Sequence, residues 1–276
     1  MSDLTDLTDL TDPNDPELSH DPWLSMKQFT PARIALGKAG MSLPTQACLD
    51  FQLAHALARD AVKSPLDFSE LTQHLNQQGM AAITLQTQVE NQRAYLQRPD
   101  LGRLLSESAL NTLSHLISRP FDAVVVVADG LSSKAIERHA IPFLTLLLPE
   151  LSRRSYAVPP ICLVRHGRVA IGDALAEYFS ARLCMVLIGE RPGLSSPDSM
   201  GIYFTYQARS GTTTDADRNC ISNIHQRGLS YAQALKKLLY LIDEAERLQL
   251  SGVNLKDETS DVDPALQLEQ GNFLLE

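Results

Sequence analysis

The stretch that most constrains the fold is the apolar run at residues 121–128, FDAVVVVA. Valine is β-branched, and the run is continuous instead of alternating with polar residues, so it predicts a strand buried on both faces. Asp129 and Gly130 end the run, and Ser132 or Ser133 can cap a following helix. A strand covered on both faces indicates a sheet that lies between helices.

Three further runs predict strands at residues 161–164, 183–189 and 201–206, with helices between most of them, including one over 172–179. Strands that alternate with helices are typical of a parallel or mostly parallel sheet. We therefore expect an α/β, Rossmann-like domain over residues 119–252.

Helical patterns flank the predicted sheet on both sides along the chain. Apolar spacing predicts helices near residues 68–77, 85–97 and 102–117, which would form a helical N-terminal region over 29–118. A long helix closes the chain's second half, with Ser230 and Gln233 as its capping box and Gly252 as its stop.

The charge is concentrated at the ends of the chain. The net charge is −9, yet residues 1–22 hold seven acids and no Lys or Arg, and residues 251–276 hold six acids and one Lys. The rest carries 20 acids and 23 bases. We predict a disordered acidic tail over 1–28, in which 1–22 could instead act as a targeting or docking peptide, and an acidic C-terminal tail over 253–276. Basic stripes interleaved with aromatics are absent, which argues against nucleic-acid binding.

Membrane, secretory and metal functions gain no support. The apolar runs are far shorter than the ~18–20 residues of a membrane helix, and the N-terminus lacks the basic and apolar regions of a secretory signal. The four cysteines, which include Cys220, form no C-x-x-C pair, so reduced cytoplasmic thiols are expected and a zinc site is not.

Ligands of open α/β sheets bind beyond the carboxyl ends of the strands. The first such loop, ADGLSSKA at 128–135, could hold an anion through backbone N–H groups, or could simply be a tight turn with a capped helix. In the second, RHGRVAIGDA at 165–174, Arg165 and Arg168 could meet phosphate or carboxylate. His166 there could be a base, although a solvated or backbone-bonded histidine is the simpler interpretation.

Glu190 follows the third predicted strand, in the segment GERPGLSSPDSMG. A carboxylate there can accept N–H bonds from a ligand amide, or can pair with Arg191. The polar segment 207–225 lacks hydrophobic anchors, so we expect it to need a partner or ligand to order it. Cys220 and His225 lie five residues apart, which suits neither a shared strand face nor a helical pair, so thiol catalysis is disfavoured.

Four segments resemble the small subunit of ethanolamine ammonia-lyase: TPARIALGKAG, VVVADGLSSKAIE, LIGERPGLSSPDSMGIYFTY and RNCISNIH. The resemblance covers about residues 30–254, and the GERPGLSSPDS run is its most specific part. That family's enzyme uses adenosylcobalamin to convert ethanolamine into acetaldehyde and ammonia. The resemblance implies radical chemistry begun by homolysis of the cobalt–carbon bond, followed by migration of the amino group.

The resemblance implies that Val169, Glu190 and Cys220 contact cobalamin, and that this chain supplies no catalytic residue and no metal ligand. Val169 offers apolar surface and backbone groups, Glu190 can accept amide N–H bonds, and Cys220 is a small polarizable surface. None of the seven histidines follows an Asp by two residues, as in the D-x-H-x-x-G motif that replaces the lower axial base. The cofactor should therefore keep its own dimethylbenzimidazole ligand.

The leading hypothesis is thus a small subunit that helps to hold cobalamin for a large catalytic subunit, within a hetero-oligomer of large–small pairs. The family's role in ethanolamine degradation implies a cytoplasmic setting and makes a bacterial microcompartment plausible. The alternative is a self-sufficient α/β nucleotide-binding module or hydrolase that uses Asp129, Ser132, His166 and Cys220.

Overall fold

The computed structural model describes residues 23–30, 32–37, 42–116 and 120–259. The chain divides into two compact units, the first ending at Ala58 and the second beginning at Arg59. The first unit contains the 3₁₀ helix η1 (Leu24–Phe29) and the start of helix α1 (Thr45–Lys63). η1 covers the last residues of the predicted disordered tail, whereas residues 1–22 lie outside the described part.

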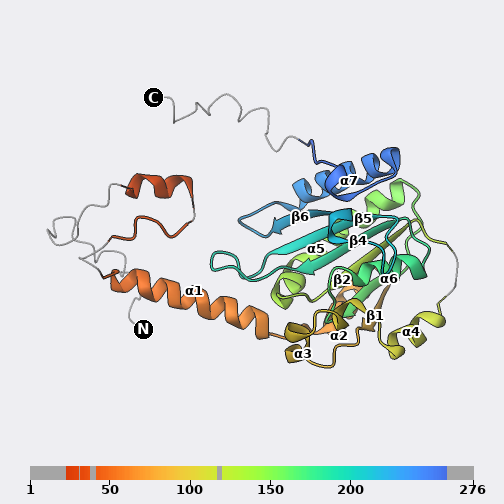
Figure 1. Cartoon of the computed structure of the whole chain (residues 1–276), viewed down its shortest axis with the longest axis horizontal. Coiled ribbons are helices and arrows are strands. Elements are labelled where there is room, and N and C mark those ends of the chain that lie inside the picture. The colour runs from red at the N-terminus through yellow and green to blue at the C-terminus, as the bar shows by residue number, and fades with distance from the viewer. Residues whose placement is uncertain (1–22, 31, 38–41, 117–119, 260–276) are drawn as a thin grey trace. The chain divides into compact units, whose positions relative to one another are not determined.

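The second unit contains the sheet and the helices that cover it (Figure 1). Its α-helices are α2 (Phe68–Gln77), α3 (Gln92–Gln97), α4 (Glu107–Ser114), α5 (Ser133–Arg153), α6 (Ile171–Tyr178) and α7 (Tyr231–Leu248). Its strands are β1 (Ala82–Gln86), β2 (Ala123–Ala128), β3 (Ile161–Arg165), β4 (Leu183–Gly189), β5 (Met200–Tyr206) and β6 (Arg218–Ile224). Short 3₁₀ helices η2 (Leu101–Arg103), η3 (Asp215–Asp217) and η4 (Gly252–Asn254) lie between or after them.

In the described residues the strands form one six-stranded sheet in the order β1-β3-β2-β4-β5-β6. The pairs β1–β3, β3–β2 and β2–β4 are parallel, while β4–β5 and β5–β6 are antiparallel. The α/β class with a mostly parallel sheet is therefore confirmed.

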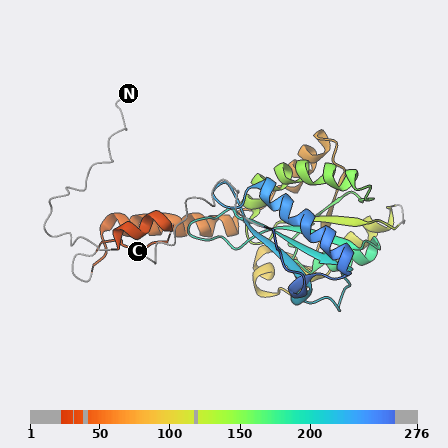
Figure 2. The ribbon, with the colours of Figure 1, turned by 90° about the horizontal axis from the view of Figure 1, so that it is seen from above.

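Helices cover both faces of the sheet and create two apolar cores. On one face, residues of α2, α5 and α7 pack with alternate strand residues such as Val125 and Leu187. Figure 2 shows α7 and α5 running over this face, and the two helices contact each other. On the other face, α4 and α6 pack with the intervening residues, such as Val126 and Val186. All of β2 and β4 is buried, as the continuous valine-rich run predicted.

Two strands were not predicted. β1 occupies residues assigned to a helix over 85–97, so that prediction is wrong, and only α3 at its end is helical. β1 is a sheet edge with only Leu85 buried, so its sequence lacks the apolar run of an interior strand. β6 lies inside the segment 207–225, for which we predicted disorder without a partner; this is also wrong, because Ile221 and Ile224 bury their side chains in the core.

The predicted end of the last helix also needs correction. The Ser230–Gln233 capping box is present, but α7 ends at Leu248, and Gln249 adopts the left-handed conformation that closes it. Gly252 instead begins η4, whose backbone is bound by the Asn219 side chain. The first residues of the predicted C-terminal tail are thus packed on β6, and residues 260–276 lie outside the described part. None of the described helices is long and apolar enough to cross a membrane.

Candidate functional site

Two of the three candidate residues, Val169 and Glu190, lie at the end of the sheet where β3 and β4 finish. Val169 lies between β3 and α6, and Glu190 directly follows β4. Because Gly189 at the end of β4 pairs with Met200 at the start of β5, the antiparallel β5 begins at this same edge. The strand pairing therefore brings the ends of β3 and β4 and the start of β5 together at one place.

A pocket of about 420 Å³ opens at this edge. Its lining contains Val169 and Glu190, two of the three residues that the resemblance implied. The other lining residues are Tyr95, Leu131, Arg168, Ile188, Gly189, Arg191 and Tyr203. The structure thus brings together two positions that are separated by a helix and a strand in the sequence.

The Glu190 carboxylate is held in a fixed position. The Ser199 hydroxyl donates to Oε2 at 2.5 Å, and the Asn223 backbone N–H faces both carboxylate oxygens at 3.4 Å. A Cβ on Gly201 would stand 2.7 Å from Oε1, so the carboxylate occupies space that only glycine leaves open. In the part of the chain that the structure describes, Glu190 makes no salt bridge with Arg191, so its charge is available to a ligand.

The loop that carries Val169 is anchored by the buried Asp129 at the end of β2. Asp129 Oδ2 accepts from the His166 backbone N–H at 3.0 Å, and Oδ1 accepts from the N–H of Gly130 at 3.0 Å. Burial raises the pKa of this carboxyl to about 6, against the effect of these backbone bonds. The Tyr95 hydroxyl also donates to the Gly167 carbonyl, at 3.1 Å. Asp129 is therefore a support for the loop.

His166 has a carboxylate neighbour that its sequence context did not reveal, because Asp129 comes from another strand. Its Nδ1 lies 3.6 Å from Asp129 Oδ2, a distance short enough for an ion pair. Burial and the nearby charge of Arg165 lower the pKa of His166, however, so the imidazole is neutral at pH 7. Nδ1 is buried with no hydrogen-bond partner among the described residues, which does not suit a general base aligned for proton transfer.

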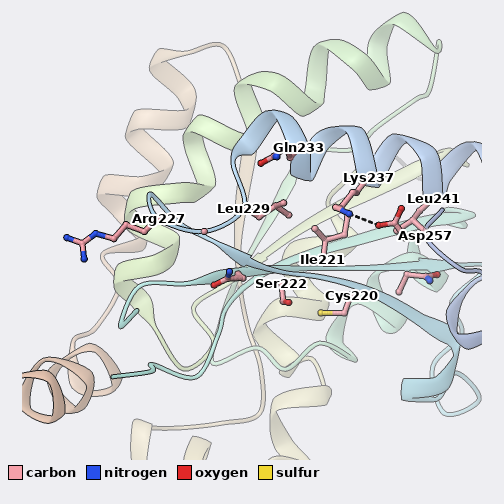
Figure 3. Close-up of a pocket in the computed structure, with 12 residues that line it drawn as sticks. Cys220, Ile221, Ser222, Arg227, Leu229, Gln233, Lys237, Leu241 and Asp257 are labelled. Carbon is pink, nitrogen blue, oxygen red and sulfur yellow. Dashed lines mark hydrogen bonds and ion pairs between the residues drawn. The ribbon is translucent and has the colours of Figure 1, made fainter. Parts of the chain in front are cut away.

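Cys220 lies within β6, opposite Tyr203 of β5, and not after a strand end as predicted. Figure 3 shows Ile221 on the α7 side of β6 and Cys220 on the opposite side. There Cys220 lies beside Tyr203, its cross-strand partner, and although the residue is exposed to solvent, partial desolvation raises the pKa of its thiol. Cys220 is therefore a protonated thiol next to the pocket residue Tyr203, and it has no sign of activation as a nucleophile.

A buried ion pair joins α6, which follows the Val169 loop, to the start of β6. Arg218 binds Asp173 through two parallel bonds of 2.7 Å, and both side chains are at most 4% exposed. Arg218 stands two residues before Cys220. The pair therefore fixes the strand of one candidate residue to the helix that follows another.

A larger groove of about 580 Å³ lies between β6 and α7, on the other side of the strand (Figure 3). It is lined largely by polar residues, and Lys237 and Asp257 form an ion pair of 2.9 Å in it. Of the three candidate residues only Cys220 is among those that line this groove, whereas Val169 and Glu190 both line the smaller pocket, which is therefore the candidate site.

The residues of the alternative hydrolase hypothesis serve structural roles. Ser132 is fully buried, caps α5 through the Ala135 N–H, and donates to the Pro197 carbonyl at 2.8 Å. His225 is bonded to Ser196 and Asn223, not to Cys220. No group of three or more potential metal-ligating side chains occurs among the described residues.

Tyr95, Ser199 and Tyr203 were missed by sequence reasoning. Tyr95 comes from α3, in a region where only helices were expected, and reaches the site because its hydroxyl binds the Val169 loop. Tyr203 lies in a predicted strand. The alternation of side chains along a strand places it on one face of the sheet, but the sequence does not indicate which face carries the site. Ser199 is in the quoted GERPGLSSPDS segment, but its partner could not be inferred from spacing.

The chain is similar over most of its length to known proteins. Residues 20–256 match the ethanolamine ammonia-lyase light chain family (EutC). An ethanolamine ammonia-lyase small subunit from Pseudomonas fluorescens is 50% identical to this chain over 264 residues, and the match covers 93% of this chain and 96% of the relative. The Pseudomonas putida protein is 51% identical over 263 residues, with 92% and 96% covered. The Pseudomonas aeruginosa protein is 49% identical over 263 residues, with 93% and 95% covered. The chain belongs to the ethanolamine ammonia-lyase light chain family.

Proposed function

We propose that this chain is the small subunit of an adenosylcobalamin-dependent ethanolamine ammonia-lyase, and that it holds cobalamin at the interface with the large catalytic subunit. The complex converts ethanolamine to acetaldehyde and ammonia by radical migration of the amino group. In this proposal Val169, Glu190 and Cys220 contact the cofactor, and the substrate binds to the large subunit.

One observation carries the proposal: Val169 and Glu190 line a single pocket, and Tyr203 of that pocket lies directly opposite Cys220 on the neighbouring strand. The chemistry of these residues fits a corrinoid, which has a broad apolar ring edged by amide side chains. Val169 supplies an apolar surface packed against the core. The fixed Glu190 carboxylate supplies an acceptor for amide N–H groups.

When bound, adenosylcobalamin would supply the radical that begins the reaction. The residues of this chain have a different task, which is to position and shield. Ser199 and the Asn223 N–H orient the Glu190 carboxylate before any ligand arrives, so little ordering entropy is lost on binding. Asp129 and Tyr95 do the same for the backbone around Val169.

The described residues also suit a cofactor that keeps its own lower ligand. His166 is the histidine nearest to Val169 in the sequence, and its Nδ1 is buried against Asp129 and points to no open position. The chain is thus expected to contribute no cobalt ligand. The large subunit would complete the site, in a hetero-oligomer of large–small pairs. We place this complex in the cytoplasm, where the family's role in ethanolamine degradation makes a bacterial microcompartment plausible.

The test is Glu190→Gln in the complex reconstituted with a large subunit. Glutamine keeps the size of the side chain and removes the charge that strengthens its hydrogen bonds. We expect cobalamin affinity to fall by roughly tenfold to a hundredfold, from the loss of one charge-assisted bond. The control is Glu90→Gln, an exposed carboxylate outside the pocket. Equal affinity in the two variants, with both chains folded, would show that Glu190 does not bind the cofactor.

A further inference from the structure

The two faces of the sheet are covered unequally. On one face, α5 and α7 contact β4, β5 and β6. On the other face, α4 and α6 make their main contacts with β1, β2 and β4. Within the described residues, the second face of β5 and β6 is therefore left largely without a covering helix.

The side chains on this open strip are Tyr203, Cys220 and Ser222. Tyr203 packs against the same core as Val169, on the face covered by α6. Cys220 and Ser222 are exposed, and Figure 3 shows both on the side of β6 away from α7. The strip is thus a continuous part of the sheet face that begins at the pocket and ends at the sheet edge.

Tyr203 is the residue that links the two parts of the candidate site. It lines the pocket together with Val169 and Glu190, and it is the cross-strand partner of Cys220. A ligand that touches both Glu190 and Cys220 must pass over or beside this ring.

We propose that Tyr203 is a fourth cobalamin contact, with its ring packed against the corrin between Glu190 and Cys220. This inference rests on the proposed function. An aromatic ring adds a large rigid apolar surface with little loss of side-chain entropy, which suits a flat and partly apolar ligand. The open strip supplies the flat surface on which such a ligand can lie.

The experiment measures cobalamin affinity of the complex reconstituted with a large subunit, for Tyr203→Ala and Tyr203→Phe. We expect Tyr203→Ala to weaken binding by about tenfold or more, since a ring-sized apolar contact is lost. Tyr203→Phe keeps the ring and should lose much less. An equal loss in both variants would assign the contact to the hydroxyl and overturn the packing of the ring on the corrin.

The matched control is Tyr240→Ala, a partly buried tyrosine that packs on the opposite face of the sheet, with α7. If Tyr203→Ala weakens binding no more than Tyr240→Ala, while Glu190→Gln does weaken it, the inference is overturned and the proposed function stands. If the wild-type chain adds nothing to cobalamin binding by the large subunit, the proposed function itself fails. Thermal melts of each chain before mixing separate a folding defect from a lost contact, and Tyr203→Leu, which is larger than alanine but has no aromatic ring, serves if the alanine variant does not fold.

Discussion

Breaking the buried pair Arg218–Asp173 should lower the free energy of unfolding far more than breaking any of the many ion pairs at the surface. Both side chains are at most 4% exposed, and two bonds of 2.7 Å join them. Asp173→Asn would keep one acceptor oxygen but remove the negative charge, and the other polar neighbours of the buried guanidinium are Thr205 at 3.3 Å and the exposed Asp215 at 3.6 Å. Removing one partner of such a pair costs about 3–5 kcal/mol. That is a large part of the ~5–15 kcal/mol by which a domain is stable.

Urea unfolding followed by circular dichroism measures this loss. The control is Asp100→Asn, because Asp100 pairs with Arg98 at 2.6 Å, yet both side chains are more than half exposed. The control should shift the unfolding midpoint far less, since water and salt screen an exposed pair. Replacing both buried partners with apolar residues should recover much of the stability lost on removing one. If Asp173→Asn and Asp100→Asn shift the midpoint equally, the buried pair does not hold α6 and β6 together as argued.

Three further predictions follow from the packing around the pocket. Gly201→Ala places a Cβ 2.7 Å from the Glu190 carboxylate, so cobalamin affinity of the reconstituted complex should fall about tenfold with little change in the melting temperature of the chain. An unchanged affinity would mean that the carboxylate position does not matter. The raised pKa of Asp129, about 6, means that the folded chain holds this proton more tightly than the unfolded chain. The contribution of Asp129 to the free energy of unfolding, on the order of 3 kcal/mol, is present below about pH 4 and is lost as pH rises to about 6. The stability of wild type relative to Asp129→Asn should therefore fall over that pH range, and a constant difference would contradict this prediction. Gly130→Ala and Gly79→Ala both strain a positive φ, but only at Gly130 would the Cβ meet a backbone oxygen, at 2.2 Å, so its melting temperature should fall much further; equal losses would show that the backbone there can move.

The interior strands of the sheet could be predicted from the sequence because all of their residues share the same apolar, buried environment. β2 and β4 are buried on both faces, so their apolar runs identify them without knowledge of their neighbours. The edge strands could not be predicted in this way. In β6 two partly or fully exposed residues separate each buried residue from the next, so the strict alternation that identifies a strand is missing, and Arg218, its first residue, is buried only because Asp173 of α6 neutralises it.

The candidate site was predictable in its chemistry and only partly in its geometry. Strand ends indicated Glu190 and the loop that contains Val169, the family resemblance singled out both residues, and the fold places both in one pocket. Cys220 was expected in a loop, because nothing in the sequence indicates that β6 turns back to pair with β5. The bond between Glu190 and Ser199 and the role of Tyr203 depend on which strands are neighbours in the sheet. The spacing of residues along the sequence does not predict the order of the strands.

The most direct test of the central claim is to mix this chain with a large subunit of ethanolamine ammonia-lyase and adenosylcobalamin, and to measure ammonia and acetaldehyde released from ethanolamine. The account predicts turnover in the mixture, none from this chain alone, and much less from the large subunit alone, because each chain holds part of the cobalamin site. Turnover by the isolated chain would contradict the account, and so would a large subunit that reaches the same rate without it.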